Sequence, residues 1–159
     1  VVFLEPKRVY RAVTEVVDDD GQSLPLDRCF VLREGRDVTL VSWGAMVKEC
    51  LAAAEKLDAQ GVTCEVIDVA TLTVFDAETV LASVGKTGRA VIVEEAPYHG
   101  GFGAQVASVL AERGLLSLRA PVQRVAGYDT VMPLPQMEKL YMPDVGRVMN
   151  AVRDALEYD

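Results

Sequence analysis

The arrangement of apolar and polar residues becomes regular at about residue 37. From there, four short runs rich in β-branched and aliphatic residues are typical of strands. These runs cover residues 37–43, 62–69, 89–95 and 122–127. A further run, RCFVLREG at Arg28–Gly35, predicts an edge strand that precedes them.

Between these runs, apolar residues recur every three or four positions, which places them on one face of a helix. The helical segments are residues 45–60, residues 76–84, the stretch from the glycine loop to residue 113, and residues 144–156. Asp76 and Asp144 precede two of these segments and are suited to cap them. Glycines follow three of the segments and are expected to stop them: Gly61, Gly85 and Gly114.

Strands that alternate with helices of this length favour a mostly parallel sheet covered by helices on both faces. The predicted fold class is therefore α/β, with three α/β/α layers and a mostly parallel central sheet. The chain has 159 residues, of which 50% are hydrophobic, and this suits one compact domain. We expect that domain to span residues 28–159.

The residues before the domain have a different character. VVFLEPKRVYRAV, at residues 1–13, is expected to be the end of a strand followed by an extended arm. Residues 15–27 hold five acids and no base, together with Gly21 and Pro25, and are interpreted as an acidic linker. Because the chain opens on VVFLEP without an initiator Met, it is expected to be a fragment or a processed piece.

Charge narrows the classes of partner. The formal net charge is −8 and the pI is about 4.7, so the surface repels phosphate backbones and anionic membranes and attracts basic proteins. Nucleic acid and membrane are therefore not expected as partners, and no apolar run approaches the roughly 20 residues that span a bilayer. Simple solubility is the alternative explanation of the charge.

The three cysteines, Cys29, Cys50 and Cys64, are widely spaced and form neither a CxxC motif nor a Cys/His pair. This pattern supports neither a zinc site nor a disulfide framework. Buried free thiols in a reducing, cytoplasmic setting are the expectation.

The segment EEAPYHGGFGAQVAS at Glu94–Ser108 holds the only histidine and a cluster of glycines. It fails as a dinucleotide fingerprint because Val106 occupies the third glycine position and the loop follows the wrong strand. GKT at 85–87 likewise fails as a phosphate-binding P-loop, because the required earlier glycine is Val80 and the motif ends a helix.

Acid–base chemistry at Glu94, Glu95 and His99 is a second hypothesis. These residues follow a parallel strand, and the carboxyl ends of such strands are where ligands bind. His99 could shuttle protons near neutral pH, but the sequence offers it no evident acid or nucleophile as a partner. A solvent-facing loop histidine is the simpler interpretation.

The glycines have a structural explanation, since they permit a sharp bend between a strand and a helix. Phe102 could anchor this bend in a pocket of its own chain or of a neighbouring one. The free amides at the start of the following helix could hold a carboxylate from a partner. On this interpretation the bend presents a surface.

Several stretches together resemble one known family. They are LREGRDVTLVSWG at 32–44, EVIDVATLTVFDAETVLASVGKTGRAVIVEEAP at 65–97, GGFGAQVA at 100–107, APVQRVAGYDT at 120–130 and LYMPD at 140–144. This set resembles the C-terminal domain of the beta subunit of thiamine-diphosphate-dependent 2-oxoacid dehydrogenases, a transketolase C-terminal-type domain. Residues 1–14 look like the end of the preceding pyrimidine-binding domain of that subunit.

The resemblance implies a non-catalytic domain for assembly and docking. It implies an alpha subunit and a second beta subunit as partners, and the basic peripheral binding domain of the dihydrolipoyl acyltransferase. Thiamine diphosphate and Mg would belong to the intact enzyme, with no catalytic, cofactor-binding or metal residue in this fragment. The candidate interface residues are those of the glycine bend and the LYMPD motif: Gly100, Gly101, Phe102, Gly103, Tyr141 and Asp144.

Two departures from the family pattern limit what is carried over. Tyr98 and His99 stand at positions expected to vary, so neither inherits a role. VMPLPQMEK at 131–139 lacks the histidine that the commoner family form carries there.

Two alternatives remain open: a stand-alone α/β ligand-binding module, and the equivalent domain of a transketolase or deoxyxylulose-phosphate synthase. The chain does not distinguish pyruvate from branched-chain 2-oxoacids. The last 31 residues hold six acids, from Asp129 to Asp159, against three bases, which suits a basic docking partner.

Overall fold

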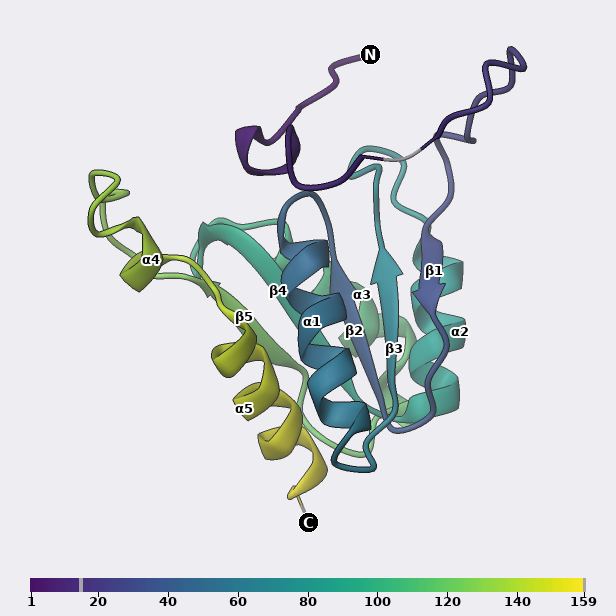
Figure 1. The fold of residues 1–159 in the computed structure, drawn as a ribbon. Helices are drawn as coiled ribbons and strands as arrows, with labels where there is room; N and C mark the ends of the chain where they lie inside the picture. The colour runs from purple at the N-terminus through teal and green to yellow at the C-terminus, as the bar shows by residue number, and fades with distance from the viewer. Residues whose placement is uncertain (15, 159) are drawn as a thin grey trace.

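The computed structural model describes residues 1–14 and 16–158, which form a five-stranded sheet between two layers of helices (Figure 1). The strands are β1 (Phe30–Arg33), β2 (Val38–Ser42), β3 (Cys64–Asp68), β4 (Ala90–Pro97) and β5 (Gln123–Gly127). The helices are α1 (Met46–Asp58), α2 (Ala77–Thr87), α3 (Gly103–Arg113), α4 (Glu138–Tyr141) and α5 (Val145–Leu156), with short 3-10 turns at Lys7–Val9 and Leu115–Ser117. The three-layer α/β fold predicted from the sequence is confirmed.

The sheet has the order β1-β3-β2-β4-β5. β2 pairs in parallel with β3 on one side and with β4 on the other, and β5 extends the parallel part. β1 is antiparallel to β3 at the edge, as expected for RCFVLREG. The chain goes from β2 to β3 in one direction and returns past β2 to β4, so the connections diverge between β2 and β4. In open α/β sheets this switch point is the usual position for a ligand, at the carboxyl ends of the strands.

Two apolar cores lie on the two faces of the sheet. Helices α1 and α5 cover one face, where they bury alternate residues of β2 such as Val38 and Leu40. Helices α2 and α3 cover the other face, against residues that include Val41 and Ile92. All five residues of β2 are buried, which explains why the central strands have nearly continuous apolar sequences.

The helix ends follow the sequence signals with one exception. Asp76 accepts a hydrogen bond from the backbone N–H of Thr79, and Asp144 from that of Arg147; each donor is the third residue of its helix, as expected of caps. Gly114 follows α3 as expected. Gly85 was expected to stop α2, but it lies inside the helix, which ends at Gly88 in the left-handed conformation with φ +76°.

Tertiary contacts explain why α2 continues past Gly85. The extra turn of α2 carries Lys86, which forms an ion pair with the buried Glu65, and Thr87, whose hydroxyl contacts the Thr39 hydroxyl at 2.8 Å. These contacts to the sheet hold the last turn in place, and the local effect of one glycine is too small to end the helix.

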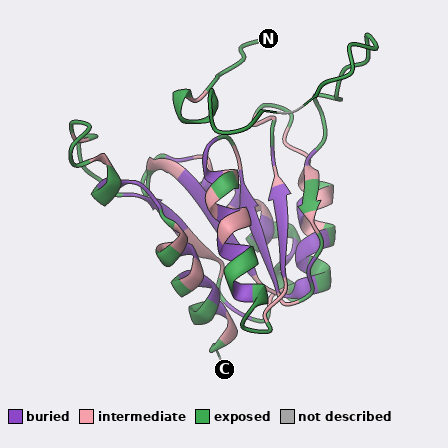
Figure 2. Cartoon of the chain, in the orientation of Figure 1, coloured by how far each residue is buried: buried purple, intermediate pink, exposed green. Residues whose placement is uncertain are grey.

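The expected strand at the amino end is also wrong for this chain. Among residues 1–14 the structure has a 3-10 turn at Lys7–Val9 and no strand, since no neighbouring strand is there to pair with the backbone of Val1–Leu4. The arm and the described part of the acidic linker are almost entirely exposed (Figure 2). Glu15, the first residue of that linker, lies outside the described residues.

The three cysteines are free and buried, as the sequence suggested. Burial raises the pKa of each thiol to about 12. Thiols with so high a pKa carry almost no thiolate at neutral pH and behave as apolar core residues. Among the described residues no helix is both long enough and apolar enough to cross a membrane.

Candidate functional site

The glycine bend between β4 and α3 is built on the buried carboxylate of Glu94. Only 1% of Glu94 is exposed, near the carboxyl end of β4. The backbone N–H of Gly103 donates a hydrogen bond to Glu94 Oε2 at 3.0 Å. A Cβ on Gly101 would stand 2.5 Å from the same oxygen, and one on Gly103 would overlap Oε1. The two glycines are therefore required because the backbone passes directly against this carboxylate.

Arg124, from the neighbouring strand β5, balances the charge of Glu94. Its guanidinium lies 2.8 Å from Glu94 Oε1, and 11% of the Arg124 side chain is exposed. The same nitrogen donates to the Tyr98 carbonyl at 2.8 Å, and the guanidinium stacks 4.4 Å from the centre of the Tyr98 ring. The pair therefore joins two strands to the first residues of the loop.

These contacts bear on two expectations for the bend. The free amides at the start of α3 were considered as a site for a carboxylate from a partner; the Gly103 amide is occupied by Glu94 of the same chain, and the interface role of the bend stays a prediction. Phe102 is anchored within its own chain, where its ring packs edge-to-face against Trp43 and Phe75, each at 5.6 Å between centres. The bend is thus an internal support, and Gly100 is its exposed member.

The two LYMPD residues also act within the chain. Tyr141 is 5% exposed, and its hydroxyl lies where a Cβ on Gly127 would stand. Asp144 caps α5 by accepting from Arg147 N at 2.8 Å. The Arg147 side chain then donates to the Ala126 and Tyr141 carbonyls at 2.5 and 3.4 Å. These contacts attach α4 and α5 to the end of β5, and they leave the interface role of both residues as a prediction.

His99 does have an acidic partner, contrary to the sequence analysis. Its Nδ1 lies 2.5 Å from Asp129 Oδ2, and its backbone N–H donates to Asp129 Oδ1 at 2.8 Å. These hydrogen bonds lower the pKa of Asp129. The His99 side chain is 85% exposed, so the pair fixes the conformation of a surface loop and encloses no pocket for a substrate.

Arg124 and Asp129 are the residues that the sequence analysis missed. A charged residue within a strand that should be buried requires a partner of opposite charge. Glu94 and Arg124 both stand in such strands, so the sequence could have predicted that they pair with each other. Asp129 is the second residue after β5, as His99 is the second residue after β4, so adjacent parallel strands bring the two together.

Glu95 has a different environment from Glu94. It is half-buried, and its Oε1 is buried without a hydrogen-bond partner among the described residues. Burial raises the pKa of Glu95, while the positive charge of Arg8 partly opposes this effect. At neutral pH the charged Glu95 carboxylate is therefore partly desolvated without a compensating partner, whereas the Glu94 carboxylate is compensated by Arg124.

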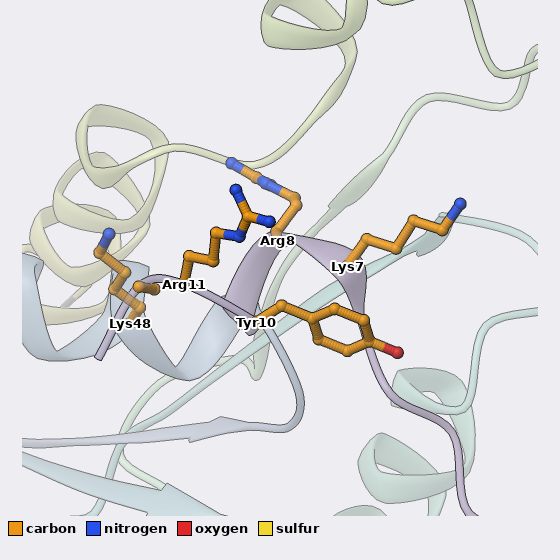
Figure 3. Close-up of a pocket in the computed structure, with 6 residues that line it drawn as sticks. Lys7, Arg8, Tyr10, Arg11 and Lys48 are labelled. Carbon is orange, nitrogen blue, oxygen red and sulfur yellow. The ribbon is translucent and has the colours of Figure 1, made fainter. Parts of the chain in front are cut away.

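The amino-terminal arm touches the residues that follow β2, beside the switch point. Pro6 lies 3.4 Å from the position that a Cβ on Gly44, just after β2, would take, and Arg8 reaches Glu49 of α1 at 3.9 Å. Beside this contact is an open hollow of about 510 Å³, which we call the basic hollow. It is lined by Lys7, Arg8, Tyr10, Arg11, Ala12 and Lys48 (Figure 3).

Comparison with known proteins places this fold in a family. A sequence model of the family described as "Transketolase, C-terminal domain" matches residues 27–148. The chain belongs to the transketolase C-terminal domain family. This match leaves out the arm and most of the acidic linker.

Relatives of the whole chain include two curated proteins and one solved structure. The chain is 45% identical over 99% of its length to pyruvate dehydrogenase E1 component subunit beta of Staphylococcus epidermidis, and 46% identical over the same share to 2-oxoisovalerate dehydrogenase subunit beta 2, mitochondrial, of Arabidopsis thaliana. It spans 49% and 44% of these proteins, about half of their length. A solved structure titled split gene transketolase, inactive beta4 tetramer, is 36% identical with a TM-score of 0.76 over 92% of this chain and 46% of that one.

Among the described residues no three His, Cys, Asp or Glu side chains are grouped so that they could hold an ion. Mg²⁺ prefers carboxylate and phosphate oxygens, whereas the basic hollow supplies only cations, a phenol and an alanine. We therefore derive no step of a thiamine-dependent reaction from these side chains.

The first prediction concerns the glycine bend. Gly103→Ala should lower the free energy of unfolding by about 2 kcal/mol or more, because the added methyl displaces the buried Glu94 carboxylate. Gly85→Ala is the matched control, since nothing lies within 4 Å of its Cβ position in α2, and it should raise stability by up to about 1 kcal/mol. Chemical denaturation measures both, and equal effects would refute the assigned contact.

The second prediction concerns Glu95. Because its folded pKa is raised, the folded state carries a penalty at pH 7 that disappears as the pH falls below the ordinary pKa of a glutamate. Glu95→Gln should therefore raise the free energy of unfolding at pH 7, by on the order of 0.5 kcal/mol, and the gain should vanish near pH 4. The exposed Glu55→Gln in α1 should show no such pH-dependent gain. A gain at pH 7 that persists unchanged at pH 4 would contradict the assignment.

Proposed function

We propose that this chain is the assembly and partner-docking domain of the beta subunit of a 2-oxoacid dehydrogenase. The observation that carries the proposal is the similarity of 45–46% over 99% of the chain to the two dehydrogenase beta subunits. In the intact complex the enzyme would oxidatively decarboxylate pyruvate or a branched-chain 2-oxoacid and transfer the acyl group to lipoyl. Thiamine diphosphate and Mg would be bound by other segments, in a cytoplasmic enzyme.

The geometry supports a role in assembly better than one in catalysis. The arm touches the chain just after β2, beside the switch point where an α/β domain would bind its ligand. Glu94, which sequence reasoning considered for acid–base work, is held within the fold by Arg124 and Gly103. Both features also argue against a stand-alone ligand-binding module. The expected partners are an alpha subunit, a second beta subunit and the basic peripheral binding domain of the acyltransferase.

The outer face of α5 is the proposed contact for that basic binding domain. Asp154 in α5 and Glu157 just after it are exposed, whereas Asp129 and Asp144 are engaged by His99 and by the Arg147 amide of α5. Asp159, which contributed to the acidic count of this region, lies outside the described residues. Two exposed acids at the carboxyl end of α5 suit a partner of opposite charge, with an affinity that falls as salt rises.

A second candidate is the equivalent domain of a split transketolase. The solved structure of that title, at 36% identity and a TM-score of 0.76, favours it. The two candidates differ in the chain that co-purifies with the native protein, which would be an alpha subunit of a dehydrogenase in one case and a transketolase partner in the other. Mass spectrometry of the native complex distinguishes them.

The third prediction tests the docking proposal on the native complex. Asp154→Lys with Glu157→Lys should weaken binding of the basic binding domain by about tenfold or more at low salt, because two attractive charges become repulsive. Glu78→Lys with Glu112→Lys, on the opposite helical layer, changes the net charge equally and should leave binding within about twofold. Calorimetric titration at two salt concentrations measures the affinities.

Equal weakening by both pairs of substitutions would mean that only net charge matters and would reject the α5 contact. Unchanged affinity after the α5 substitutions would place the binding domain elsewhere. Each variant is first checked for an unchanged melting temperature, so that misfolding is not mistaken for lost binding.

A further inference from the structure

The sulfur-containing side chains are divided between the interior of the fold and one surface segment. The chain has three cysteines and five methionines, and the three cysteines are free and buried. Met46 and Met142 lie in the apolar core beneath α1 and α5, and Met149 packs against that core. The other two methionines, Met132 and Met137, are 48% and 53% exposed. Both belong to the segment between β5 and α4.

This segment projects from the folded part of the chain. Residues 131–134 belong to no helix or strand, and residues 135–137 form a turn that leads into α4. Figure 1 shows the segment extending beyond the end of β5, and Figure 2 shows that most of it is exposed. Its other exposed apolar side chains are Val131, Leu134 and Leu140. The same stretch, VMPLPQMEK, departs from the family pattern in the sequence.

Exposed thioethers react with peroxide at neutral pH without losing a proton, whereas a cysteine reacts as its thiolate. Burial raises the pKa of all three thiols to about 12, so the cysteines of this chain compete poorly for an oxidant. In the reaction, the sulfur of methionine binds one oxygen of hydrogen peroxide as the O–O bond breaks. The other oxygen leaves as water with the proton of the transferred oxygen. Sulfur loses two electrons, and the peroxide gains them.

We propose that Met132 and Met137 form a reversible oxidation site, at which hydrogen peroxide converts both thioethers to sulfoxides while the fold stays intact. Neither side chain belongs to an apolar core, so a polar oxygen on its sulfur does not disturb the packing of the sheet. The inference goes beyond the proposed function and does not depend on it.

The chemical consequence is a change of polarity on one surface. A sulfoxide is polar and accepts hydrogen bonds, whereas the thioether that it replaces is apolar. Two sulfoxides would therefore interrupt the exposed apolar surface formed with Val131, Leu134 and Leu140. Methionine sulfoxide reductases reverse the change, since two thiols become a disulfide and the sulfoxide oxygen leaves as water. The polarity of this segment thus follows the supply of oxidant.

Graded treatment of the full chain with hydrogen peroxide, followed by peptide mapping with mass spectrometry, tests the site. Met132 and Met137 should be converted at least about tenfold faster than the buried Met46 and Met142. Once the two are converted, the melting temperature should stay within about 2 °C of that of the untreated chain. Incubation with both methionine sulfoxide reductases and a dithiol should then remove the added oxygen from both residues.

A double variant separates this site from the other methionines. Met132→Leu with Met137→Leu keeps apolar side chains of similar size and removes both exposed thioethers. Met149→Leu is the matched control, because it keeps both of them. After treatment, the parent and the control should elute earlier from a hydrophobic interaction column, because their surface has become more polar. The double variant should elute unchanged.

Four outcomes would overturn the proposal. Equal conversion of exposed and buried methionines would show that oxidation is not directed to this segment. A fall in melting temperature of more than about 5 °C on conversion of Met132 and Met137 would show that the pair supports the fold. A treated double variant that shifts as much as the parent would place the polarity change elsewhere. Sulfoxides that the reductases leave in place would show that the site is not reversible.

Discussion

The buried ion pair between Glu94 and Arg124 is the constraint on which the carboxyl edge of the sheet depends. Two charges taken out of water cost several kcal/mol each unless they are paired and hydrogen-bonded. Here Arg124 and the Gly103 amide satisfy the carboxylate, while the Tyr98 carbonyl and ring receive the guanidinium. Among the described residues the buried Nε of Arg124 has no hydrogen-bond partner. The pair thereby fixes the spacing of β4 and β5, the path of the glycine bend and the start of α3.

The glycine bend has a structural role at the carboxyl edge of the sheet. The glycine bend and Glu94, which resemble a phosphate loop and an acid–base site in the sequence, form a structural contact instead. The glycines lack side chains, so the backbone of the bend can pass close to the Glu94 carboxylate. The arm touches the chain beside the switch point, and exposed charges are found on the arm, the linker, α5 and the other helices. Interaction with other chains is the activity that such a distribution favours.

Much of the fold could be predicted from the sequence because periodicity and capping residues are local signals. The five strands, the caps at Asp76 and Asp144 and the layers follow from them. The errors arose where distant contacts decide. Gly85 failed to end α2 because Lys86 and Thr87 bind the sheet. The partners of Glu94 and His99 are Arg124 in β5 and Asp129 two residues after it, each 30 positions away. Family resemblance identified the domain but did not indicate what its glycines touch.

A double-mutant cycle on Glu94→Gln and Arg124→Met, followed by chemical denaturation, measures the central interaction most directly. Each single change leaves one buried charge unpaired and should cost about 3–5 kcal/mol, while the double change removes both charges and should cost far less than the sum. A coupling energy of about 2 kcal/mol or more would support the account. Additive effects, with each single change costing under about 1 kcal/mol, would contradict it.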